Sequence, residues 1–539
     1  MIRRRAFLQS ASLGGLALGS GLASSLWSRS AQAIPLPPRL ILPENPRDPL
    51  RLPSGKKKSV LIIGGGLAGL SAALELAERG YQVTLREASS VLGGRLATRR
   101  IKLPVGEFSV EHGLHMWFDN YHVCKEIHAR LGVHKYFRPY NQVHFQYRTY
   151  KPEVLESNPP RYPENMLKLI ERSPNLNLLD ALANLKTLAD SMFYDHATNT
   201  ARFDGQTLRA WARSRGVNNK FYDVILQPAA SVTLNDPEKI SAAAMLELMH
   251  LYFVGQPKAM NRQITTVDHH TAVIGPWEAR LRYLGVRIEL SRPVKGLRIQ
   301  LDRALGEVGS SETFDAVVLA TDVKGTQSVL AGSVALDSPA AESLADLKAK
   351  VGAMRVAPPY KILRVWLDKQ PRAEVPDVLE TPQHRPINLL AQYHLLEEES
   401  RDFAQRTGGS VLEFHLYANP LLSVVPDDAL WPLVRVVALE LMPELASAKL
   451  LARTVGSYSN FTSFEVGQGT ARPTSRYASE NGVENLSLCG DWVGTPQYPT
   501  ALMERAVVTG REAANAILLS DHVRQVPYWV TASRGPGLI

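Results

Sequence analysis

The segment Ser59–Glu87 constrains the fold of this 539-residue chain more than any other stretch. It begins with the apolar run Val60–Ile63, which is typical of a buried strand in a parallel sheet. Gly64, Gly66 and Gly69 follow in the spacing G-x-G-x-x-G. In such a turn the first glycine allows a tight bend, the second lets the backbone approach a pyrophosphate, and the third lets the helix pack on the strand. The segment therefore predicts a dinucleotide-binding turn.

The helix after these glycines supports the same prediction. Apolar residues recur at helical spacing up to Gly80, which is a suitable C-cap. Leu67 and Ala68 open the helix, where backbone N–H groups and the helix dipole would face the phosphates. A second strand follows, and Glu87 then lies where a carboxylate accepts hydrogen bonds from a ribose diol. A tight turn in another kind of α/β domain would not account for Glu87.

A second glycine turn follows in Leu92-Gly93-Gly94-Arg95. A plain nicotinamide-binding domain requires nothing at this place. Gly94 allows close approach to the far side of a pyrophosphate, and the Arg95 guanidinium neutralises its charge. The second turn therefore favours FAD over NAD.

The C-terminal segment 486–519 predicts another contact with a flavin. A strand is expected to end at Gly490-Asp491, and a helix to start near Thr500. Met503 lies in the first turn of that helix, whose N-terminus would stabilise negative charge on a reduced flavin. Asp491 is a candidate to bind a ribityl or phosphate-side hydroxyl.

The segment Glu111–His115 contains the first catalytic candidate. Gly113 permits close approach of the backbone to the flavin, and His115 either faces the flavin ring or fills the core. The neighbouring histidines 112, 122 and 128 match no zinc spacing, and H-E-x-x-H is absent. No metal site is predicted.

Length and charge bound the other possibilities. A chain of 539 residues is too long for one core, which predicts two or more domains. The formal charge is +9, and four arginines lie in the first 33 residues, so the rest carries 9 − 4 = +5. No arginine-rich stripe interleaved with aromatic residues accompanies this mild charge, so no nucleic-acid partner is predicted. Cys124 and Cys489 are expected to be buried thiols, although one bridge between them remains open.

Residues 1–33 resemble an export signal. Arg4-Arg5-Ala6-Phe7-Leu8 is similar to the twin-arginine consensus, and Ala31-Gln32-Ala33 fits a cleavage site. The expectation is export by the twin-arginine machinery to the periplasm or a membrane surface, because that route carries folded, cofactor-loaded proteins. A disordered basic N-terminus is the alternative. Seven prolines between Pro35 and Pro53 predict that residues 34–55 form an extended linker.

The middle of the chain predicts a second, largely helical region over 125–275, with a one-sided apolar stretch at 178–192. Asp236-Pro237-Glu238 has the pattern of a helix start, with an N-cap, a proline at N1 and an acid in the first turn. The helix expected over 240–253 is apolar on most sides. It is either core or the wall of a hydrophobic substrate tunnel, which Met245, Met249, Leu251 and Phe253 would line.

Two later segments are expected to return the chain to the first domain. The pattern over 286–300 predicts a strand pair around Pro293, in which Val294 would touch the adenine edge through its backbone. The run 314–321 predicts a buried strand. Residues 345–455 are expected to rejoin the second domain.

The motifs GGGLAG, Glu87, LGGR, EHGLH and GDW…ALMERAVVTG, in this order, resemble those of the flavin amine oxidase superfamily. The chain is most similar to carotenoid (phytoene and zeta-carotene) desaturases and carotenoid aromatic-ring synthases over about residues 56–520. The resemblance implies an α/β fold with a Rossmann-type FAD-binding domain and a discontinuous α+β substrate domain. It assigns contacts with FAD to Gly64, Gly66, Leu67, Ala68, Gly69, Glu87, Gly94, Arg95, Val294, Gly490, Asp491 and Met503.

Two features depart from the family pattern. Arg505 stands where most of the superfamily has glycine, whereas the aromatic-ring synthase branch has arginine there too. An export signal is unexpected in desaturases, which usually work at a cytoplasmic membrane face.

The resemblance also implies a division into domains. It assigns residues 56–124, 276–345 and 456–520 to the FAD-binding domain, 125–275 and 346–455 to the substrate domain, and 521–539 to a tail.

Three functions remain open. The first is hydride transfer from a C–H of an apolar polyene or lipid-like substrate to flavin N5, at a site that also contacts a membrane. The second is an exported amine or amino-acid oxidase that produces hydrogen peroxide, with Trp492 and Tyr498 flanking the flavin to hold a neutral amine. The third is a protein that keeps FAD for stability alone, which a blocked pocket would favour.

Overall fold

The computed structural model describes residues 37–156 and 170–535, except 178, 181–183, 185–186, 188, 191–192 and 255–257. The predicted export signal and most of the stretch 178–192 therefore lie outside the described residues. No helix in the described part of the chain is long and apolar enough to cross a membrane.

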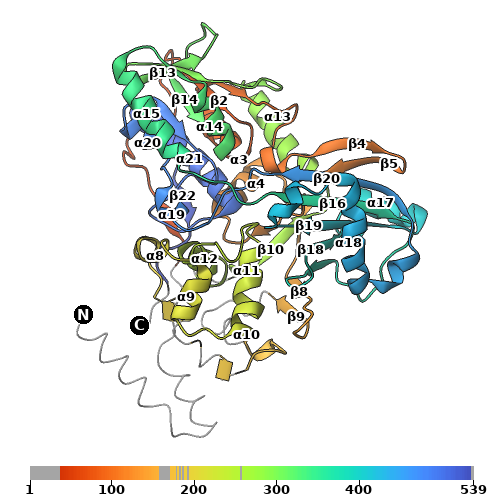
Figure 1. Ribbon diagram of the computed structural model, residues 1–539. Helices are drawn as coiled ribbons and strands as arrows, with labels where there is room; N and C mark the ends of the chain where they lie inside the picture. The colour runs from red at the N-terminus through yellow and green to blue at the C-terminus, as the bar shows by residue number, and fades with distance from the viewer. Residues whose placement is uncertain are drawn as a thin grey trace, which may run out of the picture.

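A five-stranded parallel sheet organises the half of the molecule drawn at the top of Figure 1. Its order is β11-β3-β2-β14-β21, so the first glycine-rich strand lies at the centre. The strands are β11 Arg287–Glu289, β3 Gln82–Arg86, β2 Ser59–Ile63, β14 Ala316–Leu319 and β21 Leu486–Leu488.

Both faces of this sheet are covered, which explains why its strands read as continuous apolar runs. Val60 and Ile62 point to a core shared with helices α3 (Leu67–Glu78) and α21 (Leu502–Ser520). Leu61 and Ile63 alternate to the opposite face, against α14 (Val323–Ala331) and α15 (Ser338–Gly352). The predicted strand, glycine turn, helix and strand are confirmed, with boundaries shifted by about one residue.

The strand pair predicted around Pro293 is wrong. Its first strand, β11, pairs in parallel with β3 in the central sheet. Its second, β12 (Leu297–Gln300), joins a separate sheet with β13 (Arg303–Glu307) and β15 (Val334–Ala335). The turn around Pro293 therefore connects two sheets, which strand periodicity alone does not distinguish from a hairpin.

A seven-stranded sheet forms the second half, in the order β20-β16-β19-β18-β17-β8-β9. It combines strands from two distant parts of the chain, because β17 pairs in parallel with β8. One face packs against α18 (Asp427–Leu441), and the other faces the interior of the molecule. The strands are β8 Gln142–Phe145, β9 Glu153–Glu156, β16 Tyr360–Leu367, β17 Val378–Glu380, β18 Leu389–Gln392, β19 Ser410–Leu416 and β20 Leu450–Tyr458.

Helices complete the second half. The largely helical region predicted over 125–275 is confirmed in part, because strands β8 and β9 also lie within it. The helices are α8 His196–Phe203, α9 Leu208–Ser214, α10 Asn219–Phe221, α11 Gln227–Ser231 and α12 Ala242–Met249, which continues as a π-helix over His250–Val254. The start predicted at Asp236 is wrong: Asp236 caps a tight turn by accepting from the Glu238 N–H, and Ser241 caps α12. Both are good capping residues, and sequence alone does not choose between them.

Smaller elements join these parts. They are α4 His122–Leu131, α13 Gly275–Tyr283, α16 Tyr393–Leu396, α17 Glu398–Thr407, α19 Gln468–Ala471, α20 Tyr477–Glu480, the hairpin β4 Arg99–Leu103 and β5 Gly106–Val110, and the sheet of β6 Trp117–Phe118, β10 Arg262–Thr265 and β7 Phe137–Pro139.

The predicted linker and tail contact each other. Strand β1 (Arg39–Ile41) in the linker pairs antiparallel with β22 (Tyr528–Val530) in the tail. Helix α4 packs into the same core as α3, although the predicted boundary placed most of it in the substrate domain. The division of the chain into domains otherwise stays a prediction.

Candidate active site

The three motif glycines occupy different environments at the carboxyl end of β2. Gly64 has φ +110°, and an added Cβ would lie 2.6 Å from the Ala320 carbonyl oxygen. A Cβ on Gly69 would collide with the Gly64 carbonyl oxygen, so this glycine is needed for helix packing. A Cβ on Gly66 would instead meet open space, with its nearest neighbour, the Gly94 Cα, 3.9 Å away. The backbone at Gly66 is therefore the part of the turn that a ligand can approach.

The acidic residue after β3 is held by this loop. Glu87 accepts hydrogen bonds from the backbone N–H of Gly65 at 2.6 Å and of Ser89 at 2.8 Å. The second glycine turn lies against the first, because the Gly93 N–H donates to the Gly65 carbonyl at 2.8 Å. The two turns that lie far apart in the motif pattern thus form one continuous cradle.

Arg95 and Asp491 bring the second turn and the C-terminal motif together. The Arg95 guanidinium forms an ion pair with Asp491 and lies 5.1 Å from the centre of the Phe461 ring. Asp491 also accepts from the Thr462 hydroxyl at 2.8 Å. Although burial acts to raise it, the pKa of Asp491 is held below its ordinary value by Arg95 and by hydrogen bonding. The carboxylate is therefore ionised at neutral pH.

The helix predicted near Thr500 starts at Leu502. Leu502 adopts a left-handed backbone with φ +57°, and no side chain caps the helix start at Ala501. The helix therefore presents free N–H groups at the place where the flavin edge was expected. Met503 in its first turn lines the central cavity.

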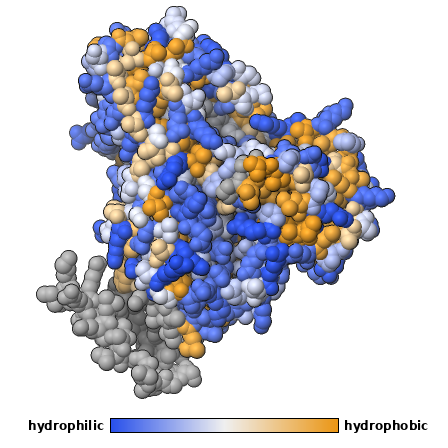
Figure 2. All heavy atoms as spheres, in the orientation of Figure 1, coloured by the Kyte–Doolittle hydropathy of each residue, from blue (hydrophilic) through white to orange (hydrophobic). Residues whose placement is uncertain are grey.

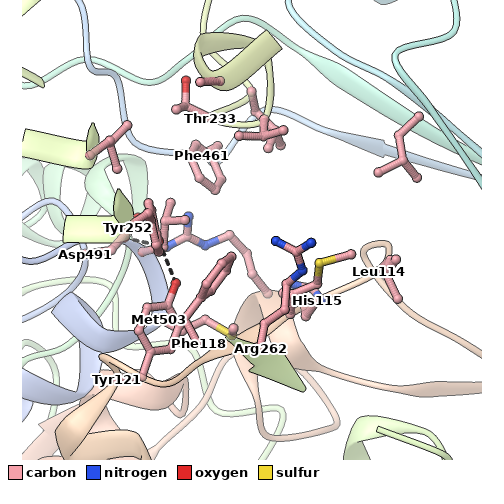
Figure 3. Close-up of a pocket in the computed structure, with 18 of the residues that line it drawn as sticks. Leu114, His115, Phe118, Tyr121, Thr233, Tyr252, Arg262, Phe461, Asp491 and Met503 are labelled. Carbon is pink, nitrogen blue, oxygen red and sulfur yellow. Dashed lines mark hydrogen bonds and ion pairs between the residues drawn. The ribbon is translucent and has the colours of Figure 1, made fainter. Parts of the chain in front are cut away.

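A cavity of about 770 Å³ connects the two halves of the molecule. Nucleotide-loop residues line one part of it, and residues of α12 and the seven-stranded sheet line another. Figure 3 shows Asp491 and Met503 among the lining side chains, with His115 and Arg262. Of the predicted site residues, the cavity brings together Gly64, Gly66, Leu67, Ala68, Glu87, Gly94, Arg95, His115, Gly490, Asp491 and Met503. These residues fit FAD, since an open glycine cradle, a carboxylate and a helix N-terminus converge on one space.

The apolar wall largely matches the prediction. Met245, Met249 and Phe253 line the cavity, together with Leu248. Leu251 is not among the lining residues, because it is buried in a small cluster with Leu248 and Ala501. The expectation for Leu251 is therefore wrong, and its position follows from the helical period of α12 and its π extension.

His115 lines the cavity and is also packed in a polar cluster. Its Nδ1 lies 2.8 Å from the Gly113 carbonyl oxygen, and its ring centre lies 5.2 Å from that of His269. Burial, with the nearby His269, lowers the pKa of His115 to about 3, so the ring is neutral at physiological pH. Gly113 has φ +110°, and a Cβ there would lie 2.7 Å from His415. Gly113 thus makes room for the His415 ring.

The structure does not bring Trp492 and Tyr498 to this cavity, contrary to the expectation that they flank a substrate. The Trp492 indole is fully buried and donates to the Thr321 carbonyl at 2.9 Å. The Tyr498 hydroxyl contacts Glu512 and, at 2.9 Å, the Tyr528 hydroxyl. Val294 is buried in the core beside the sheet and does not line the cavity, so its contact with adenine stays a prediction.

Sequence reasoning missed several residues of the cavity. Arg262 on β10 and Glu380 on β17 both line it, as do His415 and Tyr417 around the end of β19. His415 lies between Glu413, at 2.7 Å, and the Tyr417 hydroxyl. No motif surrounds these residues in the sequence, because separate strands bring them together.

The structure shows the contacts of Arg505 and the state of the two cysteines. Arg505 on α21 pairs with Glu247 on α12 at 2.8 Å and donates to the Thr500 carbonyl. It therefore ties the helix at the flavin end to the apolar wall. Cys124 and Cys489 are both buried and both free.

Comparisons with known proteins agree with this geometry. The family model for flavin containing amine oxidoreductases matches residues 67–518. A carotenoid phi-ring synthase of Chlorobaculum tepidum is 28% identical, over 89% of this chain and 91% of its own length. A protein of the same name from Streptomyces griseus is also 28% identical, over 89% and 92%. A zeta-carotene desaturase of Synechocystis is 26% identical, over 50% of this chain and 59% of its own.

Solved structures show the same fold. Cyclohexylamine oxidase of Brevibacterium oxydans matches with a TM-score of 0.58 and 16% identity, over 86% of this chain and 100% of that one. A reduced UDP-galactopyranose mutase matches with a TM-score of 0.59 and 14% identity, over 86% and 94%.

Proposed function

The chain belongs to the flavin-containing amine oxidoreductase family and is an FAD-dependent oxidoreductase, and on this premise we propose that it oxidises a long apolar polyene of the carotenoid class. The observation that carries the proposal is the cavity, which runs from the nucleotide loops along an apolar wall of α12. The names of the two relatives that match over most of their length support a carotenoid substrate.

The chain's own residues would bind, orient and shield such a substrate. Met245, Leu248 and Met249 form an apolar surface that excludes water, and the two flexible methionine side chains can adapt to a long chain. Val154 and Val232 line the cavity and are 44% and 46% exposed, so they mark where it reaches the surface. Bound FAD supplies the acceptor for a hydride from the substrate C–H. An open cavity of this size also argues against the alternative that FAD serves stability alone.

An exported amine or amino-acid oxidase is the competing function. It depended on Trp492 and Tyr498, which lie outside the cavity. No other observation favours it, so it serves as an outcome of the test.

The test is turnover by the purified, FAD-loaded protein. We expect bleaching of the flavin absorbance when a carotenoid is added without oxygen, and a more unsaturated or aromatised product by chromatography and mass spectrometry. Met249→Trp should reduce this bleaching at least tenfold without changing FAD content, because the indole would occupy the substrate space. Leu336→Trp, at a half-exposed position outside both the cavity and α18, is the matched control. Flavin bleaching and peroxide from an amine, with none from any carotenoid, would contradict the proposal.

A membrane would supply such a substrate, and we propose that an apolar patch on α18 and the preceding turn contacts it. The patch consists of Leu421, Val424, Leu433 and Val436, which are 68%, 73%, 45% and 66% exposed. Figure 2 shows apolar surface gathered over this part of the molecule. Val424→Asp with Val436→Asp should abolish sedimentation with liposomes, and unchanged sedimentation would exclude the patch.

Export by the twin-arginine machinery also remains a proposal. It is tested by fractionation of cells that carry the protein with Arg4→Lys and Arg5→Lys.

A further inference from the structure

Arg262 is an unusual residue for a cavity with an apolar wall. It is 4% exposed, and its side chain rises from β10 into the cavity (Figure 3). Its Nε and Nη2 atoms are buried and have no hydrogen-bond partner among the residues that the structure describes. The ring of Phe118 compensates in part, since its centre lies 5.9 Å from the guanidinium carbon. A buried guanidinium without hydrogen bonds costs several kcal/mol unless something pairs with it.

The other charged groups around the cavity are satisfied. Arg95 pairs with Asp491, and Arg172 pairs with Glu156 at 3.0 Å. Glu87 and Asp322 accept hydrogen bonds from backbone N–H groups. Glu153 accepts them from polar side chains, and Lys258 is exposed to solvent. Arg262 therefore differs from these groups, because it is buried and forms no hydrogen bond with any residue in the described part of the chain.

The neighbours of Arg262 do not neutralise it. Glu380 faces the same cavity, but no ion pair joins the two side chains within 4.0 Å. Burial raises the pKa of Glu380 to about 8, so this carboxyl is largely uncharged at neutral pH. Burial lowers the pKa of Arg262 to about 10, which still leaves it charged. The site thus combines one fixed cation with one neutral acid that can donate a hydrogen bond.

We propose that Arg262, assisted by Glu380, binds a carboxylate at the end of a long apolar ligand in this cavity. A carboxylate matches the planar guanidinium fork and would satisfy the two free donors. The apolar chain would lie along Met245, Leu248 and Met249. The inference deepens the proposed function by naming an end group, and it rests on that function for the identity of the cavity.

The test uses three probes with one polyene chain and different end groups: retinoic acid, retinol and retinylamine. Binding to the FAD-loaded protein is measured by isothermal titration calorimetry at pH 7. We expect retinoic acid to bind at least tenfold more tightly than retinol, and retinylamine to bind most weakly. Palmitic acid compared with hexadecanol distinguishes the source of the carboxylate. If palmitic acid binds more tightly than hexadecanol by a similar factor, the site accepts a fatty acid as well as a polyene acid.

Substitutions test whether Arg262 causes the preference for the acid over the alcohol. Arg262→Met should abolish the difference between acid and alcohol, and Arg262→Lys should restore part of it, because an ammonium keeps the charge but not the fork. Glu380→Gln should keep the preference, since the amide is also neutral. Arg138→Met is the matched control, because Arg138 lies on the paired strand β7 but outside the cavity. FAD absorbance confirms that each variant is loaded.

Three results would overturn the proposal. They are equal affinity of the wild-type protein for acid and alcohol, a preference that persists in Arg262→Met, and no binding of any probe up to its solubility. If Arg262→Met does not fold, the comparison of acid and alcohol binding to the wild-type protein still tests the proposal. Because binding is measured without turnover, these outcomes are distinct from failure of the carotenoid assay.

Discussion

The two ends of the central cavity are built in different ways. At the nucleotide end, glycine backbone and the helix start at Leu502 face the cavity, and each charged group has a partner, as in the pair Arg95–Asp491. At the substrate end, side chains from α12 and the seven-stranded sheet form the surface, and Arg262 has no hydrogen-bond partner within the described ranges. A cofactor that never changes can be held by backbone atoms, whereas substrate selection depends on side chains that can vary.

The largest effect is expected from Gly69. Gly69→Ala places a methyl group against the Gly64 carbonyl oxygen, where neither backbone can move without separating α3 from β2. We expect a loss of more than about 3 kcal/mol in the free energy of unfolding, measured by chemical denaturation followed by circular dichroism. Gly205→Ala is the control, because a Cβ there meets nothing within 4 Å. Equal stability of the two variants would contradict the packing role of Gly69.

Gly66 should separate cofactor binding from folding. Gly66→Val points its side chain into the cavity, so the protein should keep its circular dichroism spectrum and lose FAD. The ratio of flavin to protein absorbance, compared with that of Gly205→Val, measures this. A fully loaded Gly66→Val protein would mean that the cradle at the end of β2 is not the pyrophosphate site.

The pair Arg505–Glu247 joins the two ends, and breaking it should cost less. Arg505→Met leaves Glu247 without its charge partner, which we expect to destabilise the protein by about 3 kcal/mol. The double variant with Glu247→Gln should recover part of this loss. If the two single effects simply add in denaturant unfolding, the pair does not couple the two halves.

The smallest effect concerns pH and includes one histidine from each half. Burial lowers the pKa of His128 on α4 to about 3, and that of His250 beyond α12 to about 4. The unfolded chain therefore binds more protons than the native protein below about pH 6.5, so stability falls as the pH falls toward 4. Each histidine should contribute about 1 kcal/mol between pH 6 and pH 5. His250→Asn should flatten this dependence in unfolding curves, and an unchanged slope would exclude His250 as a contributor.

The glycine turns, Glu87, the C-terminal Gly490-Asp491 pair and the family were predictable from sequence, because a local backbone requirement leaves a local pattern. Trp492 and Tyr498 show the limit of this reasoning. Both lie within the correct motif, but their side chains turn to Thr321 and to Glu512. The direction of a side chain depends on what packs around it, which a short motif does not contain.

The sequence by itself therefore determined the nucleotide-binding unit and the cofactor class, because adjacent residues form that site through their backbone. The tertiary structure alone decided which face of α12 meets the cavity, that Leu251 lies outside it, and that Arg262 and Glu380 meet inside it. The physical reason is the distance along the chain. Strands β10 and β17 are separated by more than a hundred residues, and only packing of the whole molecule brings their charges to one cavity.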